Sequence, residues 1–173
     1  MPSVVKVDGI SEAEWVVRRR AAPPSADMTN RSKLPLRSLM DVGSGGGLPA
    51  VVIAVCFPEL KVLSVDAVAK KTTFITQAAL ELGLKNLRAK HSRVENIKEK
   101  FDVVTCRAFS SLKDFVSLTE SNIGEPGMWL AMKGRRPDAE LQELPSFAEV
   151  TEVIDLHIPG LGEERSVVLM RHI

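Results

Sequence analysis

The arrangement of apolar and polar residues follows a regular rhythm along this chain from residue 34 onward. Short apolar runs rich in valine and leucine alternate with longer stretches whose apolar residues recur at helical spacing. This alternation is typical of a parallel β-sheet whose strands are joined by crossover helices. The pattern predicts strands over residues 34–42, 61–67, 87–92, 101–109 and 127–134, and helices over residues 49–57, 69–84, 112–122 and 137–144.

The last two apolar runs, residues 150–158 and 164–172, are joined differently. Only the residues PGLGE separate them, which is too short for a parallel crossover, so they predict an antiparallel hairpin. The expected fold class is therefore α/β: a Rossmann-like seven-stranded sheet with five parallel strands and a C-terminal antiparallel β-hairpin. The hairpin distinguishes it from the dinucleotide-binding domain of dehydrogenases, whose sixth strand is parallel.

Residues 1–33 do not follow this pattern. They contain three consecutive arginines, a pair of prolines and several small polar residues, a composition that does not favour a packed core. We interpret residues 1–33 as a flexible or atypical lead-in, and we expect residues 34–173 to form a single domain.

The helix expected over residues 69–84 has an apolar stripe. Phe74, Ala78 and Leu82 lie at i, i+4 and i+8, a spacing that predicts a face turned toward the core. Gly83 is placed to end the helix. The basic residues Lys70 and Lys71 should lie exposed at its start.

A glycine-rich loop, DVGSGGGLP, follows the first strand and precedes the first helix. In this context Gly43, Gly45 and Gly47 allow a tight turn and let a ligand approach backbone N–H groups at a helix start. The spacing is G-x-G-x-G, and Leu48 stands where a pyrophosphate-binding loop has its last glycine. The loop therefore favours a ligand without a phosphate there; a turn that binds no ligand is the alternative.

An acidic residue, Asp66, stands nineteen residues after Gly47, at the end of the second strand. A carboxylate in this position can accept hydrogen bonds from both hydroxyls of a ribose. Together with the glycine loop, Asp66 predicts a site for an adenosine that carries a non-phosphate tail, which is S-adenosylmethionine.

Composition narrows the class of protein. The chain has 173 residues, of which 45% are hydrophobic and 26% charged, values close to the globular average. No apolar run approaches the roughly 18 to 20 residues of a membrane span, and the N-terminus lacks the pattern of a secretory signal. Cys56 and Cys106 have no partners at metal-ligand spacing. We expect a cytoplasmic monomer that binds neither a membrane nor a metal.

Charge is distributed unevenly although the net charge is only +1. The last 37 residues carry two basic and eight acidic side chains, so the excess of basic charge belongs to residues 1–136. Lys133, Arg135 and Arg136 follow the fifth strand directly and should overlook the same rim as the glycine loop. They are the candidate substrate-binding residues for a phosphate-bearing partner, although a solvated turn explains them equally well.

Several motifs occur together in one order: DVGSGGGLP, KKTTFITQAALELGLKN, HSRVE, FDVVTCRAFSSL, WLAMKG and IPGLGEER. In this combination the chain resembles the RsmG family, the glucose-inhibited division protein B methyltransferases, from about Leu36 to the C-terminus. The resemblance implies a class I S-adenosylmethionine-dependent enzyme that methylates N7 of one guanine in 16S ribosomal RNA. By the same resemblance Gly43, Leu48, Val94, Glu95 and Arg107 match positions that contact the cofactor.

The chain departs from the family at two places. Ala50 stands where the family usually has glycine, a small change that should leave cofactor binding intact. More of the difference lies in residues 1–35, where the family's N-terminal motifs have no clear match. The alternative hypothesis is therefore a truncated or non-catalytic RNA-associated domain that binds S-adenosylmethionine but lacks part of the substrate-docking region.

Methylation of guanine N7 needs no base, because N7 already carries an exposed lone pair. Alignment with the sulfonium methyl group then supplies most of the rate, and we assign no catalytic residue. Cys106 suggests a cytosine C5 methyltransferase with a cysteine nucleophile, but it lies in an apolar strand and lacks the Pro-Cys loop of those enzymes. A nucleotide-dependent oxidoreductase is disfavoured by the glycine spacing and the terminal hairpin.

Overall fold

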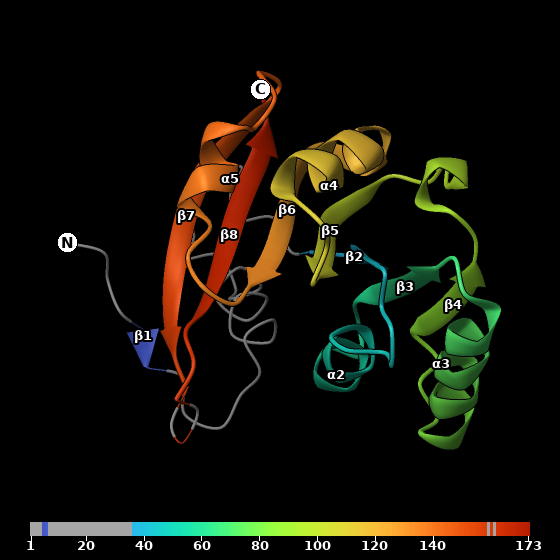
Figure 1. Ribbon diagram of the computed structural model, residues 1–173. Helices are drawn as coiled ribbons and strands as arrows, with labels where there is room; N and C mark the ends of the chain where they lie inside the picture. The colour runs from blue at the N-terminus through green and yellow to red at the C-terminus, as the bar shows by residue number, and fades with distance from the viewer. Residues whose placement is uncertain (1–4, 7–35, 159, 161) are drawn as a thin grey trace, which may run out of the picture.

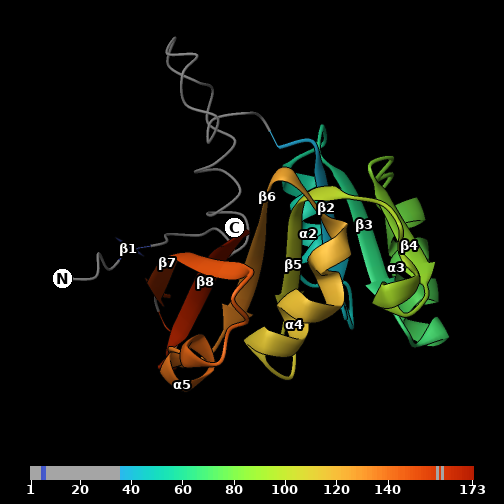
Figure 2. The ribbon, with the colours of Figure 1, turned by 90° about the horizontal axis from the view of Figure 1, so that it is seen from above.

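One mixed β-sheet forms the centre of the protein, with helices on both of its faces. The computed structural model describes residues 5–6, 36–158, 160 and 162–173. The helices α2 and α3 cover one face and α4 and α5 the other (Figures 1 and 2). The strands are β1 Val5–Lys6, β2 Ser38–Val42, β3 Lys61–Asp66, β4 Leu87–His91, β5 Phe101–Arg107, β6 Ile123–Lys133, β7 Ala148–His157 and β8 Arg165–His172. The helices are α2 Ala50–Cys56, α3 Ala69–Glu81, α4 Leu112–Thr119 and α5 Asp138–Gln142, with 3-10 turns η2 Val94–Asn96 and η3 Glu120–Asn122.

The strand order is β1-β7-β8-β6-β5-β2-β3-β4. Strands β2 to β6 are mutually parallel, whereas β8 is antiparallel to both β6 and β7. The predicted series of five parallel strands followed by an antiparallel hairpin is therefore confirmed. The two-residue strand β1, which the sequence pattern did not predict, pairs parallel with β7. Apart from these two residues, the expected lead-in lies outside the described part of the chain.

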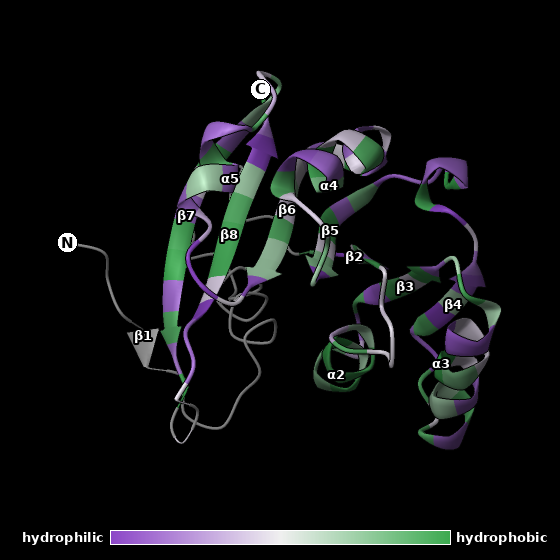
Figure 3. Cartoon of the chain, in the orientation of Figure 1, coloured by the Kyte–Doolittle hydropathy of each residue, from purple (hydrophilic) through white to green (hydrophobic). Residues whose placement is uncertain are grey.

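The core lies on both faces of the central strands, as expected for parallel strands covered on both sides. Leu39 and Ile53 belong to the cluster beneath α2 and α3, and Met40 and Phe115 to the cluster beneath α4. Helix α2 is hydrophobic along its whole length (Figure 3). Trp129 is fully buried and its indole N–H donates a hydrogen bond of 2.8 Å to the hydroxyl of Thr119.

The predicted core-facing stripe of α3 is wrong. Phe74 and Leu82 are 57% and 58% exposed, and the buried residues of the helix are Thr72, Ile75 and Ala79. Thr72 can face the core because its hydroxyl donates to the carbonyl of Ala69 in the preceding turn, so no polar group is left unpaired. A pattern that counts only apolar residues does not detect such a threonine.

The predicted end of α3 is confirmed. Gly83 has a φ of +64°, and the N–H of Leu84 bonds to the carbonyl of Ala79, which is the geometry of a glycine-terminated helix. The chain then enters β4, whose only partner among the described strands is β3. Three of the five residues of β4, Arg88, Lys90 and His91, are basic and exposed, and β4 forms one edge of the sheet.

Candidate functional site

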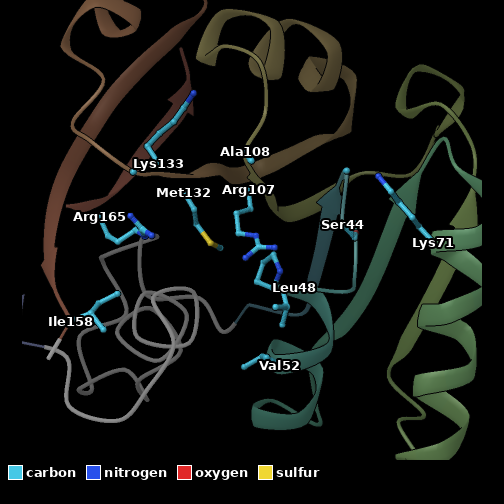
Figure 4. A pocket seen from close by; sticks show the side chains of 14 residues that line it. Ser44, Leu48, Val52, Lys71, Arg107, Ala108, Met132, Lys133, Ile158 and Arg165 are labelled. Carbon is cyan, nitrogen blue, oxygen red and sulfur yellow. The ribbon is translucent and has the colours of Figure 1, made fainter. Parts of the chain in front are cut away.

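A cavity of about 800 Å³ opens at the carboxyl ends of β2, β5 and β6. The chain leaves β2 toward β3 on one side, while β5 pairs with β2 on the other side. Open α/β sheets bind ligands at such a reversal of strand order, because the loops diverge there. Figure 4 shows the residues that line the cavity: Gly43, Ser44, Gly45, Leu48, Pro49, Val52, Lys71, Arg107, Ala108, Met132, Lys133, Gly134, Ile158 and Arg165.

The glycine loop forms one wall of this cavity. Gly43 and Gly45 have φ values of +71° and +57°, which side chains with a Cβ rarely adopt. A Cβ at Gly43 would meet nothing within 4 Å, and a Cβ at Gly45 would meet only a backbone oxygen at 4.0 Å. The space over both glycines is therefore open, and a ligand can lie directly against their backbone.

Gly47 has a different role. Its φ is +87°, and a Cβ there would lie 2.7 Å from Cγ2 of Val51 and 3.3 Å from Cγ1 of Ile75. Gly47 therefore lets α2 and α3 pack closely beneath the loop.

We expect Gly47→Ala to lower the free energy of unfolding by about 2 kcal/mol, because overpacking and an unfavourable φ add together. Urea denaturation followed by circular dichroism would measure this loss. Gly46→Ala is the matched control, since Gly46 has neither a positive φ nor an atom within 4 Å of a built Cβ. Equal losses in the two variants would contradict the packing role of Gly47.

Asp66 holds the glycine loop. Its Oδ2 accepts a hydrogen bond of 3.2 Å from the N–H of Gly45, and its Oδ1 accepts one of 2.9 Å from the N–H of Val68. The Nζ of Lys71 lies 3.8 Å from the same carboxylate. Asp66 is only 6% exposed and is not among the residues that line the cavity. Its predicted contact with a ribose remains a prediction.

Val94 and Glu95, in η2, also lie outside the cavity lining. The side chain of Val94 is 7% exposed and packs in the core beneath α4, so only its backbone is available to a ligand. Glu95 is exposed. Their predicted contacts with the cofactor are not tested by this arrangement.

Leu48 and Arg107 do line the cavity. Leu48 is 44% exposed, an unusual environment for a large apolar side chain, and forms an apolar wall beside the loop. Arg107 is the last residue of β5, is exposed, and makes no ion pair with any residue in the described ranges. Its guanidinium points into the cavity (Figure 4), where it is available to an anionic group.

The predicted basic cluster is not assembled at the cavity. Lys133 lies on the wall, but its side chain points away from Met132, Arg107 and Arg165 (Figure 4), and its Nζ lies 2.8 Å from a carboxylate oxygen of Glu140 in α5. The side chains of Arg135 and Arg136 do not line the cavity. Arg135 lies 3.4 Å from Glu164, and Arg136 pairs with Asp138 at 2.9 Å and Asp155 at 3.7 Å.

Arg165 is a cavity residue that the sequence reasoning missed. It begins β8, and the antiparallel pairing of Lys133 with Ser166 brings it to the end of β6. Its guanidinium lies on the cavity wall opposite Arg107, with Met132 between them (Figure 4), and pairs with the carboxylate of Glu163 at 2.6 Å. The predicted hairpin was the signal that could have identified Arg165. A strand that runs antiparallel to β6 begins beside the end of β6, which is the rim of the cavity.

Asp41 is the first residue of the DVGSGGGLP motif, but the sequence pattern assigned no separate role to its side chain. It lies in β2, two residues before Gly43, and is fully buried. Neither of its carboxylate oxygens has a hydrogen-bond partner of good geometry in the described part of the chain. Burial raises the pKa of Asp41 to about 7, although nearby Ser44, the N–H of Ala50 and the charge of Arg107 oppose the increase.

Cys106 is also buried, and the loss of solvation raises the pKa of its thiol far above the usual range. The thiolate that a covalent mechanism needs is therefore not accessible at neutral pH. This agrees with the rejection of a cysteine-dependent cytosine methyltransferase.

Comparison with known proteins identifies the family of this chain. A model of the family described as rRNA small subunit methyltransferase G matches residues 25–169. The chain belongs to this family. A relative from Paracidovorax citrulli (strain AAC00-1) named Ribosomal RNA small subunit methyltransferase G is 58% identical over 133 residues, 77% of this chain and 55% of that protein. A relative of the same name from Acidovorax sp. (strain JS42) is 48% identical over 155 residues, 90% of this chain and 67% of that protein.

This member of the family spans a little over half to two thirds of the length of these curated relatives. Solved structures share its fold at low sequence identity. TrmN from Thermus thermophilus matches with a TM-score of 0.68 and 17% identity over 92% of this chain and 48% of its own. A ribosomal protein L11 methylase from Lactobacillus delbrueckii subsp. bulgaricus matches with a TM-score of 0.64 and 16% identity over 92% and 77% of the two chains. The fold is that of the class I methyltransferases, as predicted.

The described residues contain no helix that is long and apolar enough to cross a membrane. They also contain no group of three or more histidine, cysteine or acidic side chains arranged to hold a metal ion.

Proposed function

We propose that this protein binds S-adenosylmethionine in the cavity and transfers its methyl group to N7 of a guanine in 16S ribosomal RNA. The observation that carries the proposal is that the open backbone of Gly43 and Gly45 lines the same cavity as the guanidinium of Arg107. Membership of a family described as rRNA small subunit methyltransferases supplies the substrate class. We further propose that residues 34–173 act as one domain.

The residues of the cavity fit the cofactor. The exposed loop backbone of Gly43 and Gly45 would lie against it, and the unpaired guanidinium of Arg107 would bind its carboxylate. Leu48 would cover an apolar part of the ligand. Asp66 ends β3, and Val94 and Glu95 follow β4, so all three lie at the carboxyl ends of the strands next to the glycine loop. We propose that the nucleoside binds on this side, with the ribose at Asp66.

The opposite half of the cavity fits an acceptor nucleotide. Met132 and Ile158 form apolar walls there, and Arg165 stands at the edge with Arg107 facing it. A planar base fits between apolar walls, and a guanidinium can bind a phosphate with two hydrogen bonds. We therefore propose Arg165 as the main phosphate contact, in preference to Arg135 and Arg136, which lie outside the cavity. Lys133 has the smaller role of bracing α5 through Glu140.

S-adenosylmethionine supplies an electrophilic methyl group on a positively charged sulfur. Because guanine N7 already presents a lone pair, no side chain has to remove a proton. The residues of this chain bind and orient the two reactants and exclude water, and the rate arises from that alignment. This accounts for a cavity without an assigned general base.

The test of this function is methylation of purified small ribosomal subunits and of naked 16S RNA by the full chain. We expect one guanine to gain a methyl group on N7, which makes the RNA cleavable at that position by borohydride and aniline. Calorimetry with S-adenosylmethionine, run in parallel, separates the two parts of the proposal. Cofactor binding without methylation of either RNA would contradict the enzymatic function and favour a truncated domain that lacks substrate docking.

Arg165→Ala should lower kcat/KM for RNA methylation by about ten- to a hundred-fold, as expected for loss of a charge-assisted phosphate contact. The affinity for S-adenosylmethionine should not change. Arg165→Lys should restore only part of the rate, because an ammonium lacks the planar fork of a guanidinium.

Arg171→Ala provides the control for this variant. Arg171 lies on the same strand and is exposed, and its guanidinium lies 2.6 Å from the carboxylate of Glu149. It does not line the cavity. If Arg165→Ala and Arg171→Ala methylate RNA equally well, Arg165 does not contact the substrate.

A further inference from the structure

The buried carboxylate of Asp41 has no explanation in the packing of the protein. Its side chain is fully buried, and neither oxygen has a hydrogen-bond partner of good geometry among the described residues, although the N–H of Ala50 is near enough to favour the charged form. Buried charged groups are normally paired, because removal from water is costly. The hydroxyl of Ser44 is close, but it donates its hydrogen bond of 3.1 Å to the backbone carbonyl of Asp41 instead.

The surroundings of Asp41 supply little compensating charge. The side chains of α2 are all apolar or, at Cys56, a thiol, so the helix brings no charge. Strand β3 contributes Asp66, an acid that further disfavours a charged Asp41. Strand β5 contributes Arg107, a cation, and Cys106, whose thiol stays protonated. Arg107 points into the cavity and is the residue proposed to bind the cofactor's own carboxylate.

A cation in the cavity would supply the missing charge. Asp41 does not line the cavity, but two residues that do are close to it: Ser44 donates a hydrogen bond to its backbone carbonyl, and the charge of Arg107 acts on its carboxylate. A charge on a ligand in the cavity would act on the same carboxylate. Charges interact strongly through a protein interior, where water does not screen them. S-adenosylmethionine carries a positive sulfur, whereas the product that remains after methyl transfer is a neutral thioether.

We propose that the buried carboxylate of Asp41 makes this cavity prefer the sulfonium cofactor over its thioether product, and that cofactor binding is coupled to the loss of a proton from Asp41. The proposal rests on the proposed binding of S-adenosylmethionine. Asp41 does not touch the ligand in this scheme and acts as a positioning residue for charge.

The same coupling would act in reverse after the reaction. When the methyl group moves from sulfur to guanine N7, the sulfur keeps the electron pair of the broken bond, and the positive charge leaves with the base. Asp41 is then left buried beside a neutral thioether and takes up a proton from solvent. Loss of the favourable charge interaction weakens binding of the product and promotes its exchange for new cofactor.

Calorimetric titration of the full chain with each ligand, between pH 5.5 and 8.5, tests the proposal. We expect S-adenosylmethionine to bind about ten-fold more tightly than S-adenosylhomocysteine at pH 8, as one unscreened charge pair allows. Its affinity should fall as the pH falls below 7, because Asp41 then holds its proton. Titration in two buffers of different ionisation enthalpy should detect the released proton.

Asp41→Asn should remove the preference for the sulfonium ligand, its pH dependence and the released proton. Glu99→Gln is the matched control, since Glu99 is exposed and pairs only with Arg88 among the described residues. Circular dichroism establishes that each variant is folded. If Asp41→Asn does not fold, the two-buffer titration of wild-type protein below pH 7 tests the coupling by itself. Binding of S-adenosylmethionine without release of a proton would then overturn the proposal.

The outcomes separate the two proposals. Tight binding of S-adenosylmethionine with the same preference and pH dependence in wild type and Asp41→Asn would overturn the role of Asp41 and leave cofactor binding intact. No binding by wild-type protein at any pH would overturn the proposed function, and the inference with it.

Discussion

Replacement of Gly45 by valine is expected to abolish binding of S-adenosylmethionine. The φ of +57° at Gly45 is strongly unfavourable for a β-branched residue. The new side chain would also project into space that is now open above the loop, which is the approach path of the ligand. Together these effects should weaken binding by more than about a hundred-fold, a loss of at least 2.7 kcal/mol, measurable by calorimetry.

The control for this prediction is Gly46→Ala, one position further along the loop. Gly46 lacks a positive φ and has open space around it, so a methyl group there should leave cofactor affinity nearly unchanged. Circular dichroism and thermal denaturation should show that Gly45→Val remains folded. Loss of binding together with global unfolding would support a purely structural turn.

Replacement of Asp41 by asparagine should stabilise the protein at pH 8. Burial raises the pKa of Asp41 from 3.8 to about 7, so the folded state holds a proton that the unfolded state releases. Wild-type stability therefore falls as the pH rises from about 4 to about 7 and stays low above that range. At about 1.36 kcal/mol for each unit of pKa difference, the expected gain is on the order of 4 kcal/mol.

Urea denaturation at pH 8, 6 and 4 measures this effect. The advantage of Asp41→Asn should be largest at pH 8, smaller at pH 6 and absent near pH 4. Asp102→Asn is the contrasting variant and should lower the free energy of unfolding, because Asp102 accepts hydrogen bonds from the N–H groups of Arg37 and Ser38 at 2.8 and 2.9 Å, and a neutral amide accepts such bonds less strongly than a carboxylate. A pH dependence of wild type that is unchanged in Asp41→Asn would show that Asp41 does not titrate in this range.

Much of the fold was predictable because it depends on short-range patterns. Apolar runs identified β2 to β8, and the five residues between the last two runs required a hairpin. The glycine loop was equally clear, since Gly43, Gly45 and Gly47 all adopt the positive φ that their spacing suggested. The face of α3 was mistaken because Thr72 satisfies its hydroxyl within the helix and packs like an apolar residue.

The charges of the site were less predictable, because ion pairing depends on residues far apart in sequence. The sequence alone shows no acidic partner for Lys133 or Arg136. In the folded protein, α5 brings Glu140 to Lys133 and β7 brings Asp155 to Arg136. Arg165 falls near the start of the predicted strand 164–172, and only the return of β8 beside β6 places it at the cavity. Asp41 is an ordinary acid by sequence, and its unusual titration follows from complete burial.

The composition of β4 has a consequence for how copies of this protein meet one another. An edge strand exposes unpaired N–H and C=O groups, which are a template for pairing with a second sheet and a starting point for aggregation. In β4, Arg88, Lys90 and His91 occupy three of the five positions. Two such edges brought together would place the Lys90 ammonium groups of the two copies near each other, and Arg88 would add repulsion that its pairing with Glu99 only partly offsets. The strand that closes the sheet thus also protects the protein from polymerising along it.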